Sequence, residues 1–362
     1  MKVGVLGAGQ LGRMLALAGY PLNHQFGFSA QSNDEPAALL GHLFAQDDNA
    51  DHIESLAAFA DVITYESENT SVEAVREINK NVPVYPGEKS LYTTQHRGRE
   101  KALFNKLGIP CAPYQVVNSL EELEVAVTTI GLPGILKTTT EGYDGKGQFV
   151  IKTPDQVAEA WESMQGAEAI LEGFVNFKRE LSLIAVRGID NDHRYYPLVE
   201  NTHHEGILRL TIAPAQAIDP HVQQTAERYI ESLLDEMGHV GVLTIELFET
   251  DTGLVANEMA PRVHNSGHWS IEGANTSQFE NHVRAITGMP LGDTTPTHPH
   301  SAMINIIGQT GPVEKALEMA NAHLHLYDKA EREGRKLGHI NLTANSMAEL
   351  EASIEQLKDF LP

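Results

Sequence analysis

The chain has 362 residues, more than one compact hydrophobic core usually serves, so we expect two or three domains. Its 26 basic and 49 acidic residues give a formal net charge of −23, which disfavours nucleic acids and anionic membranes as partners. The longest apolar runs, such as 240–247, are far shorter than a membrane span. The single cysteine, Cys111, excludes an intrachain disulfide framework and fits a cytoplasmic protein.

Residues 1–95 alternate strand and helix signals. Strands are predicted at 3–6, 25–29 and 61–65, and helices at 10–18 and 71–79, with another helix opening at 36–40. Alternation of this kind favours an α/β fold with a parallel, doubly wound sheet.

The pattern then changes to a small α+β module and a longer C-terminal part. A helix at 100–107 precedes strands at 135–137, 149–151 and 169–174, a helix at 155–164, and antiparallel strands at 180–186 and 193–198. Further along are a helix at 220–236, a hairpin at 242–259, strands near 302–307, a basic cluster at 329–336 and a helix at 347–360. We therefore expect domains at 1–95, 96–200 and 201–362.

Gly7, Gly9 and Gly12 form a G-x-G-x-x-G turn between the first strand and the first helix. A nicotinamide dinucleotide site would need an acidic residue at the end of the second strand, but Asp34 and Glu35 come late. A tight turn without a ligand is the second interpretation. A phosphate cradle at the helix N-terminus is the third, and the rest of the chain favours it.

Lys137 ends an apolar strand and is followed by the glycine-rich loop 142–147. A lysine at a strand end and a mobile loop with its own lysine can clamp a polyphosphate and exclude water. The Walker A spacing is absent. A plain hairpin with a solvated lysine is the weaker alternative. Downstream, residues 172–175 are expected to line a nucleobase pocket and Glu180 to bind the ribose.

Two glutamates are predicted to face each other across the 242–259 hairpin. If the hairpin is symmetric about Thr252, Glu246 lies opposite Glu258, with Cβ atoms roughly 5 Å apart on one face. Two such carboxylates repel each other unless a cation or proton lies between them, and oxygen ligands suit Mg²⁺. Two solvent-facing glutamates on a sheet edge are the alternative.

Arg262, His264 and Asn265 follow the hairpin and combine fixed positive charge with hydrogen-bonding groups. We expect them to bind a small anion beside the γ-phosphate. A purely structural loop is the alternative, and it is the favoured interpretation for His268 and Trp269.

Five motifs together resemble the ATP-grasp superfamily and, within it, the N5-carboxyaminoimidazole ribonucleotide synthetase family. They lie at 9–14, 64–69, 142–148, 257–269 and 334–341, in the order of that family and over nearly the whole chain. The resemblance implies three domains, a homodimer, and the carboxylation of 5-aminoimidazole ribonucleotide by ATP and bicarbonate. ATP and Mg²⁺ are the implied cofactors.

The resemblance also implies roles for individual residues. ATP would contact Arg97, Lys137, Gly142, Tyr143, Asp144, Gly145, Lys146, Gly147, Gln148, Glu172, Gly173, Phe174, Val175, Glu180, His203, Asn257 and Glu258. The ribonucleotide would contact Gln10, Leu11, Tyr143, Asp144, Lys146, Lys329, Arg335 and Lys336, with Glu66 or Glu68 near its aminoimidazole. Glu246 and Glu258 would bind Mg²⁺, and the catalytic group would be Lys137, Arg262, His264 and Asn265.

Two residues depart from the family pattern. Ser67 replaces an aromatic residue, and His96 replaces an aspartate. Alternative functions are another ATP-grasp ligase, such as a formate-dependent glycinamide ribonucleotide transformylase or a carboxylase subunit, a nicotinamide-dependent oxidoreductase, and a non-catalytic nucleotide-binding module.

Overall fold

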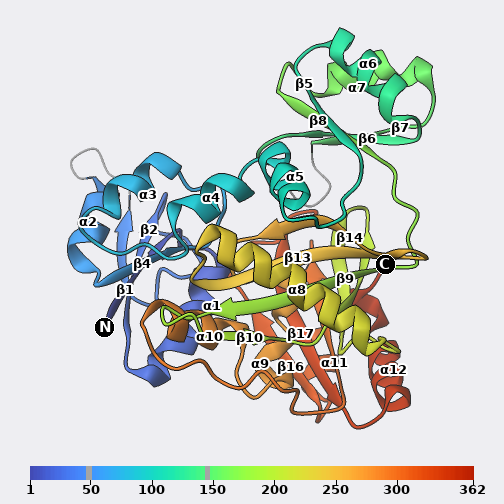
Figure 1. Cartoon of the computed structure of the whole chain (residues 1–362). Helices are drawn as coiled ribbons and strands as arrows, with labels where there is room; N and C mark the ends of the chain where they lie inside the picture. Colours follow the sequence, from blue (N-terminus) through green and yellow to red (C-terminus); the bar gives the residue numbers. More distant parts are fainter. Residues whose placement is uncertain (46–50, 143–146) are drawn as a thin grey trace.

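The computed structural model describes residues 1–45, 51–142 and 147–362, and three β-sheets organise them (Figure 1). A four-stranded parallel sheet lies at the N-terminal end, a second four-stranded sheet is antiparallel, and a nine-stranded antiparallel sheet lies between and below them. No helix of these residues is both long and apolar enough to cross a membrane.

The parallel sheet has the order β3-β2-β1-β4 and confirms the expected α/β N-terminal unit. Its apolar strand residues, such as Val3, Val5 and Phe28, are fully buried. The expected helix at 36–40 is wrong: the segment forms turns, and the Ala37 N–H donates to the Ala8 carbonyl at 2.8 Å. The elements are β1 (Lys2–Leu6), α1 (Gln10–Gly19), β2 (Gln25–Ala30), β3 (His42–Ala45), α2 (His52–Phe59), β4 (Val62–Tyr65), α3 (Val72–Ile78) and α4 (Glu88–Thr94).

Helix α5 (Arg97–Lys106) links the first unit to the small antiparallel sheet, whose order is β5-β8-β6-β7. One apolar core joins this sheet to its two helices. The small unit projects from the body of the molecule, at the upper right of Figure 1. Its elements are β5 (Tyr114–Val117), α6 (Leu120–Ile130), β6 (Gly134–Thr138), β7 (Gln148–Ile151), α7 (Val157–Ser163) and β8 (Ala169–Gly173).

The large sheet has the order β14-β13-β9-β11-β12-β15-β17-β16, with β10 paired to β9. Its strands are β9 (Arg179–Arg187), β10 (His193–Tyr195), β11 (Val199–His204), β12 (Ile207–Ala213), β13 (Gly241–Thr250), β14 (Gly253–Ala260), β15 (His300–Ile307), β16 (Ala322–Leu326) and β17 (Lys336–Ala344). Sheet membership therefore changes between Gly173 and Arg179, earlier than the expected boundary at residue 200. The division into three domains stays a prediction.

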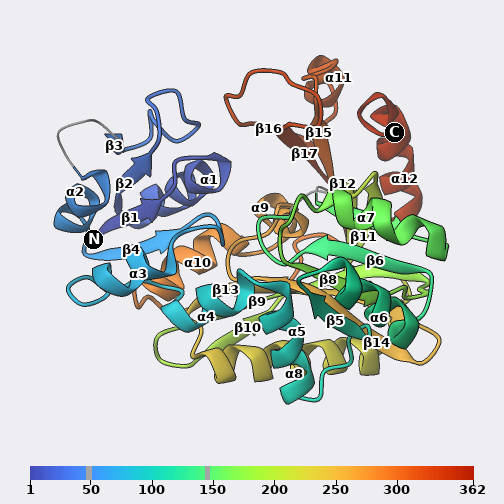
Figure 2. The ribbon, with the colours of Figure 1, turned by 90° about the horizontal axis from the view of Figure 1, so that it is seen from above.

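Helices cover both faces of the large sheet. Its remaining helices are α8 (Pro220–Met237), α9 (Ser270–Gly273), α10 (Gln278–Ile286), α11 (Val313–Leu317) and α12 (Met347–Gln356). Helix α8 packs on strands β9 and β13 through one apolar core, while α10 packs on the same strands and on α1 through another. In Figure 2 the parallel sheet lies at the left and α12 at the right, with this sheet between them.

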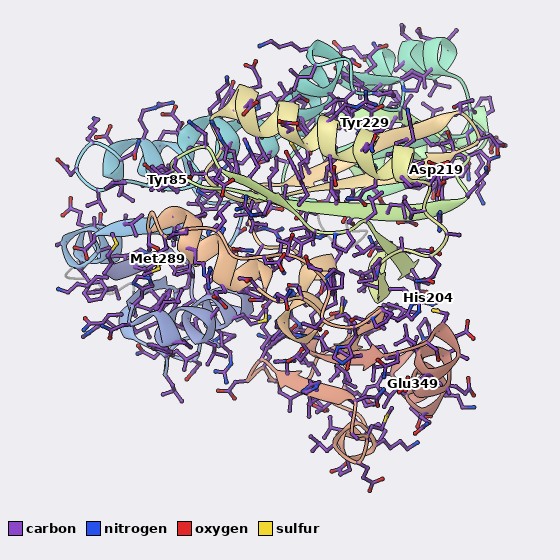
Figure 3. The ribbon with its side chains drawn as sticks, turned by 60° about the horizontal axis from the view of Figure 1, so that its bottom comes forward. Tyr85, His204, Asp219, Tyr229, Met289 and Glu349 are labelled. Atoms are coloured by element: carbon purple, nitrogen blue, oxygen red, sulfur yellow. The ribbon has the colours of Figure 1, made fainter. Side chains whose placement is uncertain are left out.

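Helix α8 shows how local sequence fixes an element. The Asp219 carboxylate caps it by accepting the His221 N–H at 2.8 Å, and Pro220 occupies the first turn, where no backbone donor is needed. Figure 3 labels Asp219 at the start of the helix and Tyr229 midway along it. Gly238 adopts a left-handed φ of 59° and ends the helix.

Two buried histidines join the large sheet to the N-terminal unit. His282 Nδ1 accepts the Val242 N–H at 3.1 Å, so its Nε2–H donates to Thr64 on β4 at 2.9 Å. His239 Nε2 donates to the Val242 carbonyl at 3.0 Å, and its Nδ1 lies 3.0 Å from the Ser90 hydroxyl on α4. The Val242 N–H holds His282 in the neutral form, and burial disfavours the charged form of both rings, lowering the pKa of His282 to about 4 and that of His239 to about 3.

Acidification should weaken this junction. Because the folded-state pKa of His282 lies below the unfolded value, the unfolded chain binds more protons, and stability falls as the pH drops from about 6.5 towards 4. Each proton contributes about 1.4 kcal/mol per pH unit. We therefore expect the free energy of unfolding, measured in urea at several pH values, to depend less steeply on pH in His282→Gln. The difference in slope should correspond to about one bound proton. Identical slopes for the variant and the native chain would contradict the assignment.

Candidate active site

A cavity of ≈ 820 Å³ is lined by residues that follow or belong to strands of all three sheets. Residues 66–69, which follow β4, form one wall, α5 and the loop 139–142 form another, and β13, β14 and the segment 327–336 form a third. Further lining residues come from 10–11, 94–95, 203–208 and 262–268. The expected site residues that line it are Gln10, Leu11, Glu66, Glu68, Arg97, Gly142, His203, Glu246, Glu258, Arg262, His264, Asn265, Lys329, Arg335 and Lys336. Residues expected to bind the nucleotide, the ribonucleotide and the metal thus share one cavity.

Glu246 and Glu258 are directly opposite each other, as the sequence predicts, but a different register brings them together. The hairpin turn pairs Thr250 with Gly253, so the paired residue numbers sum to 503, not 504. A β-bulge between Glu246 and Leu247 leaves Asn257 as the extra residue, and beyond it Glu246 pairs with Glu258. The expected symmetry about Thr252 is therefore wrong, although the predicted pair is correct.

The surroundings of the two carboxylates shift their pKa values in opposite directions. Burial and the neighbouring Glu258 carboxylate raise the pKa of Glu246. Burial opposes ionisation of Glu258, but the Arg97 guanidinium and the Lys137 ammonium group outweigh it and lower its pKa. Arg97 donates to Glu258 at 2.7 Å, and His264 Nε2 lies 3.2 Å from Glu246. A second full negative charge at this pair therefore needs a nearby cation.

The two carboxylates suit a Mg²⁺ ion that keeps waters and substrate phosphates as ligands better than a metal ion that is bound by protein side chains alone. Within the described residues no cluster of three or more His, Cys, Asp or Glu side chains is arranged to bind a metal ion. Mg²⁺ is usually bound by one or two carboxylates together with waters and substrate phosphates. Two opposed glutamates at the wall of a large cavity match that pattern, and Glu246 and Glu258 are the residues that would bind it.

Lys137 lies behind the cavity wall. Its Nζ donates to the Glu172 carboxylate at 3.1 Å, and Lys101 Nζ lies 3.4 Å from the same oxygen. All three side chains are buried. Burial lowers the pKa of Lys137, while for Glu172 burial is outweighed by the two lysines, which lower its pKa. Lys137 and Glu172, which were expected to contact ATP separately, therefore form a buried ion pair with each other.

The loop after β14 presents positive charge and hydrogen-bonding groups to the cavity. The Arg262 guanidinium donates twice to Glu68, at 2.6 and 2.9 Å. His264 Nδ1 accepts the Ser266 N–H at 3.3 Å, so its Nε2–H faces Glu246. Burial and Arg262 lower the pKa of His264 to about 3, so this imidazole is neutral. The amide oxygen and nitrogen of Asn265 are buried and have no partner among the described residues.

The N-terminal glycine turn has a different role from the expected one. The Gly9 N–H donates to Glu66 Oε1 at 2.7 Å, and the Gly12 N–H donates to Glu66 Oε2 at 2.9 Å. A Cβ at Gly7 would lie 2.4 Å from the Glu66 side chain. The protein's own carboxylate thus occupies the helix N-terminus, and the phosphate cradle and the nicotinamide site both lose their anion-binding groups.

The two acidic residues of the 64–69 motif are now distinguished. Glu68 is committed to Arg262, whereas Glu66 sits between the glycine turn and the cavity. Lys329, from the basic segment, donates to Gln10 on α1, and burial lowers the pKa of Lys329 to about 8. The N-terminal helix and the C-terminal segment 329–336 therefore meet at one end of the cavity.

Several expected site residues lie outside the cavity lining. These are Lys137, Gly147, Gln148, Glu172, Gly173, Phe174, Val175, Glu180 and Asn257. Glu180 nevertheless lies 2.7 Å from Nδ1 of His203, which does line the cavity. Tyr143, Asp144, Gly145 and Lys146 fall outside the described residues, so their predicted roles stay predictions.

Of the two residues that depart from the expected family pattern, His96 has a clear local role in the structure, whereas the contacts of Ser67 do not explain its departure. His96 Nδ1 accepts the Gly98 N–H at 3.1 Å and so caps α5, while its Nε2 lies 2.6 Å from Glu168. An imidazole thus serves as the N-cap of α5, a position where aspartate is among the preferred residues. Ser67 lines the cavity and accepts the Asn69 N–H at 3.2 Å, but nothing in the structure explains the loss of an aromatic side chain there.

Sequence reasoning missed Glu100, a buried carboxyl group in the cavity wall. Burial raises its pKa to about 8, and it accepts the Met259 N–H at 2.6 Å. A signal was present, because Arg97, Glu100 and Lys101 have the i, i+3, i+4 spacing that places side chains on one helix face.

The fold and the cavity define an ATP-grasp enzyme. Residues 102–279 match the ATP-grasp domain family, residues 1–95 the ribonucleotide synthetase preATP-grasp domain, and residues 301–353 the phosphoribosylaminoimidazole carboxylase C-terminal domain. N5-carboxyaminoimidazole ribonucleotide synthase from Pseudomonas aeruginosa is 48% identical over 359 residues, 99% of each chain. The chain belongs to the N5-carboxyaminoimidazole ribonucleotide synthase family.

Solved structures agree with this assignment. The N5-carboxyaminoimidazole ribonucleotide synthetase from Thermus thermophilus has a TM-score of 0.94 and 45% identity, covering 99% of this chain and 98% of that one. N5-carboxyaminoimidazole synthase from Aspergillus clavatus, solved with ADP and 5-aminoimidazole ribonucleotide, has a TM-score of 0.91 and 34% identity, with 99% and 98% coverage.

Proposed function

We propose that this protein carboxylates the amino group of 5-aminoimidazole ribonucleotide, with ATP and bicarbonate, in purine biosynthesis. The observation that carries the proposal is one cavity shared by the Glu246–Glu258 pair, the Arg262–Asn265 loop and the basic segment 329–336. A ligase that joins three substrates needs a nucleotide site, an anion site and an acceptor site within reach of one another. The names of the relatives supply the identity of the acceptor.

The first step is phosphoryl transfer. A bicarbonate oxygen attacks the γ-phosphorus of ATP, ADP leaves, and carboxyphosphate forms. Arg97 in the cavity wall and Lys137 behind it provide positive charge for the phosphoryl transfer, and Arg262 and Asn265 bind and orient bicarbonate. Mg²⁺ bound by Glu246 and Glu258 would supply further positive charge against the phosphate oxygens.

The second step is carboxylation. Carboxyphosphate releases phosphate and CO₂, the amine of the ribonucleotide attacks the carbon, and the nitrogen loses one proton to form the carbamate. Lys329, Arg335 and Lys336 are the cations for the ribonucleotide phosphate. Glu66, which accepts the Gly9 N–H next to Gln10, is the carboxylate assigned to the aminoimidazole. The cavity has to exclude water, because water would hydrolyse the intermediate.

Product analysis tests the function directly. With labelled bicarbonate, ATP and 5-aminoimidazole ribonucleotide, we expect label in an acid-labile carbamate and ADP release in equal amount. Glycinamide ribonucleotide with formate serves as the control for the other ATP-grasp chemistry. ADP release that depends on neither bicarbonate nor the aminoimidazole ribonucleotide would overturn the proposal.

The family resemblance also supports two finer proposals, a homodimer and a cytoplasmic location. Cys111, half-buried and free, suits a reducing compartment.

A further inference from the structure

The bulge at Asn257 decides which way Glu258 points. Had the register of the hairpin turn continued, Glu258 would lie opposite Ile245, whose side chain is buried in the apolar core beneath α8. A one-residue slip of a strand moves every following side chain to the other face. The extra residue therefore turns Glu258 away from that core and towards Glu246.

The bulge lies on an edge strand of the large sheet. β14 is the last strand in the sheet order, so its outer N–H and C=O groups have no neighbouring strand. A bulge also interrupts the ladder to β13, and buried backbone groups left without partners cost stability. Something other than a strand has to satisfy these groups.

Helix α5 supplies those partners with two consecutive side chains. Lys101 Nζ donates to the carbonyl of Asn257, the bulged residue, at 2.7 Å, and Glu100 accepts the Met259 N–H at 2.6 Å. These two contacts flank Glu258 on either side. The exposed fraction of Lys101 is 1% and that of Glu100 is 3%, so water cannot easily replace either contact.

The same helix also contacts the Glu258 side chain. Arg97, one turn earlier, donates to its carboxylate at 2.7 Å. Just after the helix, the Pro110 carbonyl accepts the Ala256 N–H at 2.7 Å. Residues 97–110 thus take the place of the absent neighbouring strand along 256–259.

We propose that Glu100 and Lys101 are positioning residues for the carboxylate pair, because they stabilise the bulge that turns Glu258 towards Glu246. The inference rests on the metal-binding role proposed above for that pair. Neither residue is required to touch metal or substrate in this scheme. Their effect is exerted through the backbone of β14.

The test compares four variants in the full chain. Lys101→Met removes the donor to Asn257, and Glu100→Ala removes the acceptor for Met259. Glu100→Gln retains an acceptor oxygen, so it is the conservative rescue variant. Lys106→Met is the matched control, because Lys106 lies on the same helix but forms an exposed ion pair with Glu236.

Two readouts are independent of turnover. In metal-free protein, amide hydrogen exchange at Met259 should accelerate in Glu100→Ala and Lys101→Met but not in Glu100→Gln or Lys106→Met. Mn²⁺ binding in the presence of ADP, followed by electron paramagnetic resonance, should weaken about 10- to 100-fold in the first two variants, as is typical when the support of a metal ligand is lost. Glu100→Gln should retain affinity within about threefold of the native chain.

The outcomes separate this inference from the proposed function. If Glu258→Gln binds Mn²⁺ normally, the metal site itself is wrong. If Glu258→Gln loses Mn²⁺ while Lys101→Met and Glu100→Ala bind it like the native chain, the positioning role is overturned. Faster exchange at Met259 with unchanged Mn²⁺ affinity would also overturn it, because the contacts would then serve only the stability of the strand.

Discussion

Replacing Glu258 with glutamine should reduce ADP release on the order of a thousandfold while the protein stays folded. The amide keeps the size of the side chain and can still accept a hydrogen bond from Arg97, so the geometry around β14 should survive. The amide is neutral, so it cannot supply the negative charge with which residue 258, together with Glu246, would bind a divalent cation. Steady-state ADP release at several Mg²⁺ concentrations measures the loss of turnover. Thermal unfolding followed by circular dichroism shows whether the variant stays folded.

Asp251→Asn is the matched control for this charge removal. Asp251 lies in the turn of the same hairpin, and its side chain is 87% exposed. We expect native turnover from that variant. A near-native rate for Glu258→Gln, or an unchanged Mg²⁺ dependence, would refute the metal assignment.

Replacing Glu68 with glutamine should lower both stability and the apparent affinity for bicarbonate. Glu68 accepts two hydrogen bonds from Arg262 and lies on the N-terminal unit, so the pair joins that unit to the loop that follows the strand carrying Glu258. Losing the charge leaves a largely buried guanidinium without its counter-ion, at a cost of about 2 kcal/mol. The freed Arg262 should lose its orientation, and we expect the KM for bicarbonate to rise about tenfold.

An exposed ion pair in the same unit provides the comparison. Glu88→Gln breaks the pair with Arg76, whose side chain is 51% exposed, and should change the free energy of unfolding by less than about 0.5 kcal/mol. Urea unfolding of both variants and bicarbonate titrations of ADP release give the measurements. Equal stability losses for Glu68→Gln and Glu88→Gln would show that the Arg262 contact has no special role.

The predicted carboxylate pair shows how far local pattern extends. β-rich runs on either side of an Asp-Thr-Gly turn were enough to place Glu246 opposite Glu258. The bulge at Asn257 was not predictable from those residues, because its stability depends on Glu100 and Lys101, more than 150 residues earlier in the chain. The prediction assumed one register for the whole hairpin. The turn has a different register, and the bulge shifts the pairing so that Glu246 still lies opposite Glu258.

The glycine turn shows the opposite case. Gly7, Gly9 and Gly12 form a strand-to-helix turn, as expected, but the anion at the helix N-terminus is Glu66. A motif reports which backbone groups are available and not what fills them. The distinction between Glu66 and Glu68 likewise required the position of Arg262, which is 194 residues away from Glu68 in sequence.

By itself the sequence determined the α/β N-terminal unit, the carboxylate hairpin and the family, because strand alternation, turn residues and motif spacing are local properties of the chain. Only the tertiary structure decided how the acidic and basic residues pair: Glu66 with the glycine amides, Glu68 with Arg262, and Glu100 and Lys101 with the bulge of β14. Such pairing depends on which elements meet across sheets, and that is set by the burial of apolar faces and not by distance along the chain.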